Sequence, residues 1–201
     1  VVMSRDAAGY LVALPCDCTR LEQRTNLFNA ARVPAGYHRA SIEEYKGITD
    51  SQQALRYHLL RFRKDFMPGD RGVLLMGPPG VGKTHLLCAL IAHFTLERGI
   101  PCRYVEFMAL LSQLKDGYNQ GKTESEVIQP VARIPLLVID ELGKGKNSEW
   151  ELGVLDGIIS ARYNTGRTTL VATNYMETAA AVPEPEPGRA YGRATVRPQL
   201  Y

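Results

Sequence analysis

Residues 77–84 carry the strongest chemical signal of the chain, because they read Gly-Pro-Pro-Gly-Val-Gly-Lys-Thr and match the pattern G-x-x-x-x-G-K-[ST] in full. Glycines let the backbone fold around a β-phosphate with its N–H groups inward, and a helix starting here adds the positive end of its dipole. Lys83 would reach the β- and γ-phosphate oxygens, and Thr84 would ligate Mg²⁺. A plain turn with an exposed lysine is disfavoured, because the loop lies between an apolar run and a helical pattern. The residues expected to bind the nucleotide are Gly77, Pro78, Pro79, Gly80, Val81, Gly82, Lys83, Thr84 and His85.

A second segment, Leu136-Leu137-Val138-Ile139-Asp140-Glu141, ends an apolar run with two adjacent carboxylates. Beside a phosphate loop, Asp140 would hold Mg²⁺ through water, and Glu141 would orient and deprotonate the attacking water. The alternative is a strand that ends in a solvated acidic turn, and the presence of a phosphate loop in the same chain disfavours it. The second carboxylate favours a hydrolase over a kinase that acts on a small molecule.

Asn174 follows the apolar run 169–172, where a strand is expected to end. Its amide could hydrogen-bond the lytic water or the γ-phosphate. A strand-end asparagine that favours a turn is an equally good explanation of this position. The predicted catalytic residues are therefore Glu141, Lys83 and Asn174.

The elements that must position these residues alternate between strand and helix patterns. Strands are expected at 73–76, 102–106, 136–139 and 169–172, and helices at about 21–31, 50–67, 84–98, 107–118, 124–132 and 148–164. Asp50 or Ser51 would cap the second helix, and Ser148 with Glu151 forms a capping box for the last. This alternation predicts an α/β fold of the P-loop type, with three α/β/α layers around a mostly parallel sheet.

Three regions are expected along the chain. Residues 1–49 are poorly periodic and are interpreted as an N-terminal extension outside the core, residues 50–175 as the ATP-binding core, and residues 176–201 as an irregular tail rich in proline and glycine. Because both ends fall in mid-pattern, we expect a trimmed fragment whose C-terminal part is truncated.

The composition indicates one globular domain. The 201 residues are 45% hydrophobic and 22% charged, with a formal net charge of +3, which permits a polyanionic partner without requiring one. No apolar run reaches the 18 or more residues of a membrane span, and the first residues lack a secretory signal, so the expected compartment is the cytoplasm.

The cysteines and histidines offer little further chemistry. Cys88 and Cys102 fall in apolar runs and are interpreted as buried thiols. Cys16 and Cys18 could supply half of a tetrahedral zinc site, but no second ligand pair is visible. The histidines lack metal-type spacing, and packing is the default explanation for those on the helix after the phosphate loop.

The phosphate loop, the pair Asp140-Glu141, and Asn174 resemble the Walker A, Walker B and sensor-1 elements of AAA+ ATPases. Residues 29–37, 136–143 and 158–164 resemble, more specifically, the DnaC/IstB group of helicase loaders and transposition helpers. The similarity covers most of residues 15–175, and the assignment to the subgroup rests on these looser flanking segments.

The resemblance implies a protein that binds ATP, forms a homo-oligomer with ATP at the subunit interface, and binds single-stranded DNA. It would deliver a replicative helicase or a transposase to its site. A membrane is not among the expected partners. The candidate DNA contacts, each of which could equally belong to a solvated face, are Lys115, Tyr118, Lys122 and Arg133. Lys144 and Lys146 could touch DNA or a neighbouring protomer, or form a flexible loop.

Two departures from the family pattern matter. No arginine-finger segment appears before Tyr201. The tail does contain Arg189, Arg193 and Arg197, but its richness in proline and glycine does not match the segment that carries the finger in this family. Residues 9–18 look like the second half of a zinc-binding module found in some relatives, which predicts Zn²⁺ in a longer parent protein. A helicase-loader ATPase remains the leading hypothesis, ahead of a transposition helper, a nucleotide-gated adaptor that does not hydrolyse ATP, and a P-loop kinase.

Overall fold

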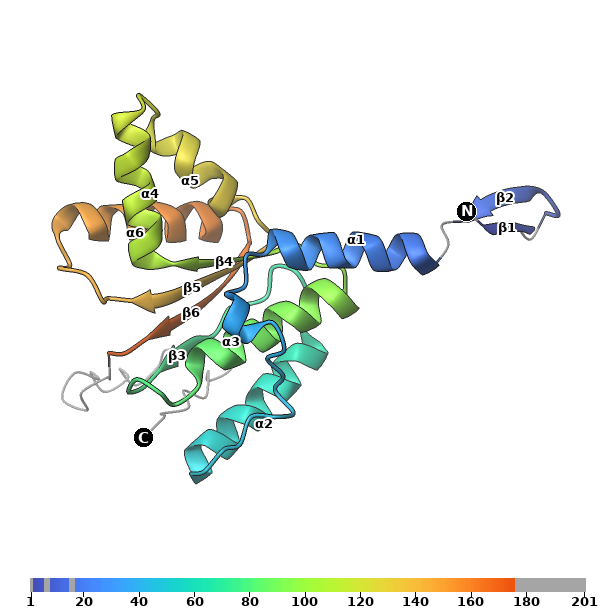
Figure 1. Cartoon of the computed structure of the whole chain (residues 1–201), viewed down its shortest axis with the longest axis horizontal. Coiled ribbons are helices and arrows are strands. Elements are labelled where there is room, and N and C mark those ends of the chain that lie inside the picture. The colour runs from blue at the N-terminus through green and yellow to red at the C-terminus, as the bar shows by residue number, and fades with distance from the viewer. Residues whose placement is uncertain (1, 6–7, 15–16, 176–201) are drawn as a thin grey trace, which may run out of the picture.

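The computed structural model describes residues 2–5, 8–14 and 17–175 (Figure 1). A short antiparallel hairpin pairs β1 (Val2–Arg5) with β2 (Leu11–Leu14). The helices that follow are α1 (Asp17–Ala30), α2 (Asp50–Asp65), α3 (Lys83–Ala92), α4 (Phe107–Asn119), α5 (Glu124–Ala132) and α6 (Glu149–Asn164). No helix in these described ranges combines the length and apolar character that crossing a membrane requires.

The remaining strands form one parallel sheet in the order β3-β6-β5-β4. They are β3 (Leu74–Met76), β4 (Cys102–Glu106), β5 (Leu136–Leu142) and β6 (Thr168–Thr173). The register places Met76 beside Thr173 and Glu106 beside Asp140. All four strands therefore end at the same edge of the sheet, which is where ligands bind in parallel α/β folds.

Helices cover both faces of the sheet, as the three-layer prediction requires (Figure 1). Leu136 and Val138 pack on one face in a core shared with α2 and α3. Leu137 and Ile139 pack on the other face in a core shared with α4, α5 and α6. Successive residues of a strand point to opposite faces, so a fully apolar run such as β5 is buried on both.

The segment between α1 and α2 differs from the sequence-based expectation, because it belongs to the core rather than to an extension. Ala31 and Ile42 are 0% and 1% exposed, and both lie in the same core as α3. The carbonyl of Ala31 also accepts a 2.8 Å hydrogen bond from the N–H of Tyr104, on the outer edge of β4. Single anchoring residues between proline and glycine breakers leave no periodicity, so the pattern analysis missed them.

Element ends differ in smaller ways. Thr49, rather than Asp50 or Ser51, caps α2, and it forms a capping box with Gln52. The helix after the phosphate loop ends as a π-helical turn, η2 (His93–Glu97), before Gly99 with its φ of +67°. The capping box of Ser148 and Glu151 at the start of α6 is confirmed.

Candidate active site

The phosphate loop joins the end of β3 to the start of α3, as the motif predicts. Gly77, Gly80 and Gly82 have φ of +151°, +84° and +92°, values that favour glycine. Left-handed residues beside right-handed ones turn successive N–H groups toward one point, which is how a backbone nest binds an anion. A Cβ on Gly82 would lie 2.6 Å from Cε2 of Tyr45, so this position also needs glycine for space.

The side chain of Lys83 lies between the backbone of the phosphate loop and Asn174, which follows β6, and the residue is only 7% exposed. Its Nζ donates to the carbonyls of Gly77 at 2.8 Å and Pro78 at 2.9 Å, and to Oδ1 of Asn174 at 2.8 Å. Burial lowers the pKa of Lys83, while the charges of Asp140 and Glu141 oppose that effect. The structure thus joins two predicted catalytic residues, Lys83 and Asn174, by one hydrogen bond.

Asp140 is 2% exposed and receives hydrogen bonds at both oxygens. Its Oδ2 accepts from Oγ1 of Thr84 at 2.7 Å and from the hydroxyl of Tyr104 at 2.8 Å, and its Oδ1 accepts from the N–H of Glu141 at 2.8 Å. The two predicted magnesium ligands, Thr84 and Asp140, are therefore in contact. Their hydroxyl and carboxylate oxygens are the donor type that Mg²⁺ prefers, so these residues fit the ion.

Tyr104 was not predicted as a site residue. It lies on β4, and burial raises the pKa of its hydroxyl, as does the neighbouring charge of Asp140. The hydroxyl therefore remains a proton donor to Asp140 at any physiological pH. No motif marks this tyrosine, and only the pairing of β4 with β5 reveals it.

Glu141 sits in a β-bulge rather than in regular strand geometry. The pairing of β5 with β6 shifts register between Ile139 and Leu142, and Glu141 adopts a left-handed φ of +54°. A bulge re-aims a side chain at the end of a strand, and backbone of this kind is concentrated at functional sites. The sequence predicted that Glu141 lies at the end of a strand, where the structure has it, but gave no sign of the bulge.

Two neighbours set the charge state of Glu141. Nζ of Lys144 lies 2.8 Å and 2.9 Å from its two carboxylate oxygens, and this contact is the main cause that lowers the pKa of Glu141. The pKa of Glu106 is raised, first by burial and then by its hydrogen bond and charge repulsion with Glu141. Of the two coupled carboxylates, Glu106 and Glu141, Glu141 therefore loses its proton at the lower pH.

The outer side of the phosphate loop is held by the segment before α2. The hydroxyl of Tyr45 donates to the carbonyl of Val81 at 2.8 Å, and its ring stacks on that of His85, with centroids 6.4 Å apart. Nε2–H of His85 donates to the carbonyl of Ser41 at 2.8 Å. His85 therefore packs against Tyr45 and Ser41, which is the alternative to its predicted contact with the nucleotide. Tyr45 contacts the phosphate loop, and no sequence pattern indicated this.

The predicted DNA contacts do not form one cluster. Nζ of Lys115 lies 5.1 Å from the ring centroid of Trp150, and the hydroxyl of Tyr118 donates to Glu124 at 2.7 Å. Lys122 precedes α5, whereas Arg133 follows its last residue. A helix rises 1.5 Å per residue, so the length of α5 separates Arg133 from Lys122.

The remaining sequence candidates are partly outside the described structure. Cys16 and the arginines Arg189, Arg193 and Arg197 lie outside it. Within the described ranges, no group of three or more His, Cys, Asp or Glu side chains could hold a metal ion. Cys88 and Cys102 are buried, as predicted, and burial raises the pKa of each thiol to about 12.

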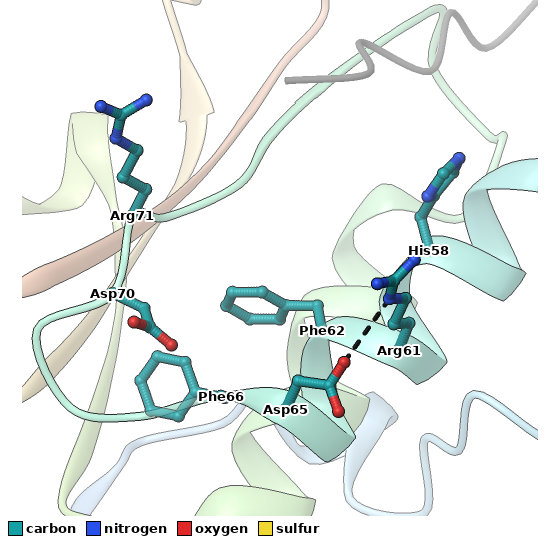
Figure 2. Close-up of a pocket in the computed structure, with 7 residues that line it drawn as sticks. All are labelled: His58, Arg61, Phe62, Asp65, Phe66, Asp70 and Arg71. Atoms are coloured by element: carbon teal, nitrogen blue, oxygen red, sulfur yellow. Dashed lines mark ion pairs between the residues drawn. The ribbon is translucent and has the colours of Figure 1, made fainter. Parts of the chain in front are cut away.

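A separate pocket of about 340 Å³ lies between α2 and the segment leading into β3 (Figure 2). Figure 2 shows the Arg61–Asp65 ion pair of 3.5 Å on one side and Arg71 on the other. The pocket adjoins the residues that precede β3, whereas the phosphate loop follows that strand. It therefore contains none of the predicted nucleotide-binding residues.

Comparison with known proteins agrees with this geometry. Residues 17–181 match the family described as IstB-like ATP binding protein. The replicative helicase loader DnaC of Escherichia coli K12 is 28% identical over 153 residues, which are 76% of this chain and 61% of that protein. The chain therefore spans less than two thirds of this relative.

Solved structures show the same similarity. The crystal structure of the DnaC helicase loader superposes with a TM-score of 0.66 at 29% identity, covering 73% of this chain and 82% of that one. The structure of DnaI gives a TM-score of 0.62 at 28% identity, with 72% and 77% covered. With the family match extending over residues 17–181 and the phosphate loop, Asp140 and Asn174 gathered at one edge of the sheet, the chain belongs to the IstB-like ATP-binding protein family and has an AAA+ fold.

Proposed function

We propose that this protein binds ATP with Mg²⁺, hydrolyses the ATP, and uses this cycle to load a replicative helicase onto single-stranded DNA. The observation that carries the ATPase proposal is the convergence of three distant segments. Lys83 contacts Asn174, 91 residues away, and Thr84 contacts Asp140, 56 residues away. These contacts support the proposal, because they join the residues that we propose bind the phosphates, hold Mg²⁺ and sense the γ-phosphate.

Each group has a distinct task in hydrolysis. The loop N–H groups and Lys83 would bind the phosphates, while Thr84 and Asp140 would hold Mg²⁺, which when bound neutralises phosphate charge. Glu141 would take a proton from the attacking water. The water oxygen would bond to the γ-phosphorus while the bond from that phosphorus to the β–γ bridging oxygen breaks. The products are ADP and phosphate.

Asn174 would act at the γ-phosphate. Its Oδ1 accepts from Lys83, so its Nδ2–H₂ is left to donate to a γ-phosphate oxygen or to the water. With its oxygen bonded to Lys83 and its nitrogen bonded to the γ-phosphate, the Asn174 amide would link the lysine to the reacting phosphate. It would also transmit the loss of the γ-phosphate to β6.

The helicase-loading part of the proposal is supported by the DnaC relatives. The candidate contacts to single-stranded DNA remain Lys115, Tyr118, Lys122 and Arg133. Neighbouring copies of the protein would meet at the bound ATP. A transposase as client is the alternative that the IstB family name suggests. Zn²⁺ at Cys16 and Cys18 also stays a proposal. Cys18 is disulfide-bonded in the structure, so zinc binding would require the reduced thiol, and metal analysis of the reduced protein that finds no stoichiometric zinc would reject it.

The first experiment measures phosphate release from ATP, with and without a single-stranded oligonucleotide, for the wild type and Glu141→Gln. We expect DNA-responsive turnover that falls at least about 100-fold in the variant, since a general base contributes this much. The variant should still bind a fluorescent ATP analogue. Tight binding without turnover in the wild type would instead support the nucleotide-gated adaptor, and co-purification with helicase or transposase would identify the client.

A further inference from the structure

A strap of backbone before α2, residues 40–47, lies against the outer side of the phosphate loop. Tyr45 makes its contact with the loop: the hydroxyl donates to the carbonyl of Val81 at 2.8 Å, and the ring occupies the space that a Cβ on Gly82 would need. Burial raises the pKa of Tyr45, so the hydroxyl keeps its proton and donates it. The loop is therefore held by a side chain from outside its own motif.

The strap is anchored to α2 and to the core, independently of the loop. Nε and Nη2 of Arg56 donate to the carbonyls of Ile42 and Glu43 at 3.0 Å and 3.1 Å. Arg63 forms a 2.7 Å ion pair with the carboxylate of Glu43. Ile42 is buried in the core that α2 and α3 share. Because its backbone is fixed in this way, Tyr45 can hold the loop in place rather than move with it.

The Val81 carbonyl and the Gly82 N–H belong to the same peptide group. A trans peptide is planar and points its carbonyl and its N–H in opposite directions, and the described chain has no cis peptide bond. Tyr45 holds the carbonyl on the outer side of the loop, so the N–H of Gly82 points to the inner side, where a bound phosphate would lie. One hydroxyl thus sets the direction of one phosphate-binding donor.

The loop needs such support because its glycines do not fix it. Three of them have positive φ, and glycine loses more conformational freedom on ordering than any other residue. Lys83 supports the start of the loop through the carbonyls of Gly77 and Pro78, and Tyr45 supports its end through Val81. A loop that is already ordered loses less free energy when its ligand binds.

We propose that Tyr45 is a positioning residue for the nucleotide: through the Val81 carbonyl it keeps the Gly82 N–H aimed at the β-phosphate before the nucleotide binds. This proposal rests on the proposed function and adds to it a residue outside the phosphate-loop motif. Since ATP and ADP both carry a β-phosphate, Tyr45 would affect the binding of both equally. Asn174, which would contact the γ-phosphate, would affect ATP alone.

The test compares the affinities of ATP and ADP, measured by displacement of a fluorescent ATP analogue in the presence of Mg²⁺. Tyr45→Phe keeps the ring and removes the hydroxyl. It should weaken both nucleotides by the same factor, about 5- to 30-fold, which corresponds to fixing the backbone of one residue again. Asn174→Ala should weaken ATP and leave ADP unchanged. Tyr57→Phe removes a hydroxyl from a ring that is 64% exposed on α2, and it should change neither affinity.

The outcomes distinguish this proposal from the ATPase proposal. A change below about twofold in Tyr45→Phe, or a loss for ATP with ADP unchanged, would overturn the role of Tyr45 and leave the proposed function standing. A lower urea midpoint with unchanged affinities would show a purely structural role and would also overturn it. Wild-type protein that binds neither nucleotide would overturn both proposals. The expected pattern in a protein that does not hydrolyse ATP would support the role of Tyr45 and reject the ATPase.

Discussion

Replacing Lys83 with alanine tests the assignment of the phosphate loop most directly. Among the described residues the ammonium has three acceptors, the carbonyls of Gly77 and Pro78 and Oδ1 of Asn174, at 2.8 to 2.9 Å. Because an ammonium has three N–H donors, a nucleotide phosphate would replace one of these acceptors, and such a charge-assisted hydrogen bond contributes about 1.5 to 3 kcal/mol. Since 1.4 kcal/mol corresponds to a factor of ten, Lys83→Ala should weaken ATP binding about 10- to 150-fold.

The same substitution should leave the fold intact. Burial lowers the pKa of Lys83, which means that keeping its charge in the folded state costs free energy. Removing that charge offsets the lost hydrogen bonds, so we expect the free energy of unfolding to change by no more than about 1 kcal/mol. Urea titration of both proteins checks this point.

Affinity is best measured by titration with a fluorescent ATP analogue in the presence of Mg²⁺. Asn174→Ala is the matched comparison, because Lys83 retains two carbonyl acceptors in that variant. It should weaken binding less, about 2- to 12-fold, since one hydrogen bond from an uncharged amide contributes about 0.5 to 1.5 kcal/mol. A loss below about threefold in Lys83→Ala, or a larger loss in Asn174→Ala, would refute this account of the loop.

Arg162, the two buried thiols and Gly82 provide three further tests. Arg162 is 1% exposed and donates to the carbonyls of Ala132, Ile134, Pro135 and Thr168, so Arg162→Ala should lower the free energy of unfolding in urea by about 3 to 5 kcal/mol; a loss below about 1 kcal/mol would contradict this. With thiol pKa values of about 12, Cys88 and Cys102 should resist iodoacetamide at pH 8 in the native protein and react in urea, as mapped by mass spectrometry; native labelling would contradict their burial. Gly82→Ala should abolish binding of the ATP analogue, because a left-handed φ and the Tyr45 ring both exclude a Cβ, and wild-type affinity would disprove this.

The parts of the site predicted from the sequence are those written in local patterns. The phosphate loop is a contiguous motif, and an apolar run ending in Asp140-Glu141 marks its own strand. The capping box at Ser148 is likewise a relation between residues three positions apart. Local spacing also located the strands β3 to β6 and the helices between them, because hydrophobic periodicity follows directly from secondary structure.

The parts that were missed depend on which segments become neighbours. Tyr104 and Glu106 join the site only because β4 pairs with β5, and a strand run alone does not name its partner. Tyr45 reaches Val81 across 36 residues of chain, from a segment without periodicity. The bulge at Glu141 arises from the register between β5 and β6, which is a property of two strands together.

Strand order explains why Asn174 can link the two halves of the site. In the order β3-β6-β5-β4, β6 lies between the strand that carries the phosphate loop and the strand that carries Asp140 and Glu141. Neighbouring strands are about 4.8 Å apart, so the end of β6 is within side-chain reach of both. In the sequential order β3-β4-β5-β6, Asn174 would be three strands from the loop, too far for its 2.8 Å bond to Lys83. The insertion of β6 is thus the feature of the fold that lets one amide contact the phosphate-binding lysine beside the predicted catalytic carboxylate.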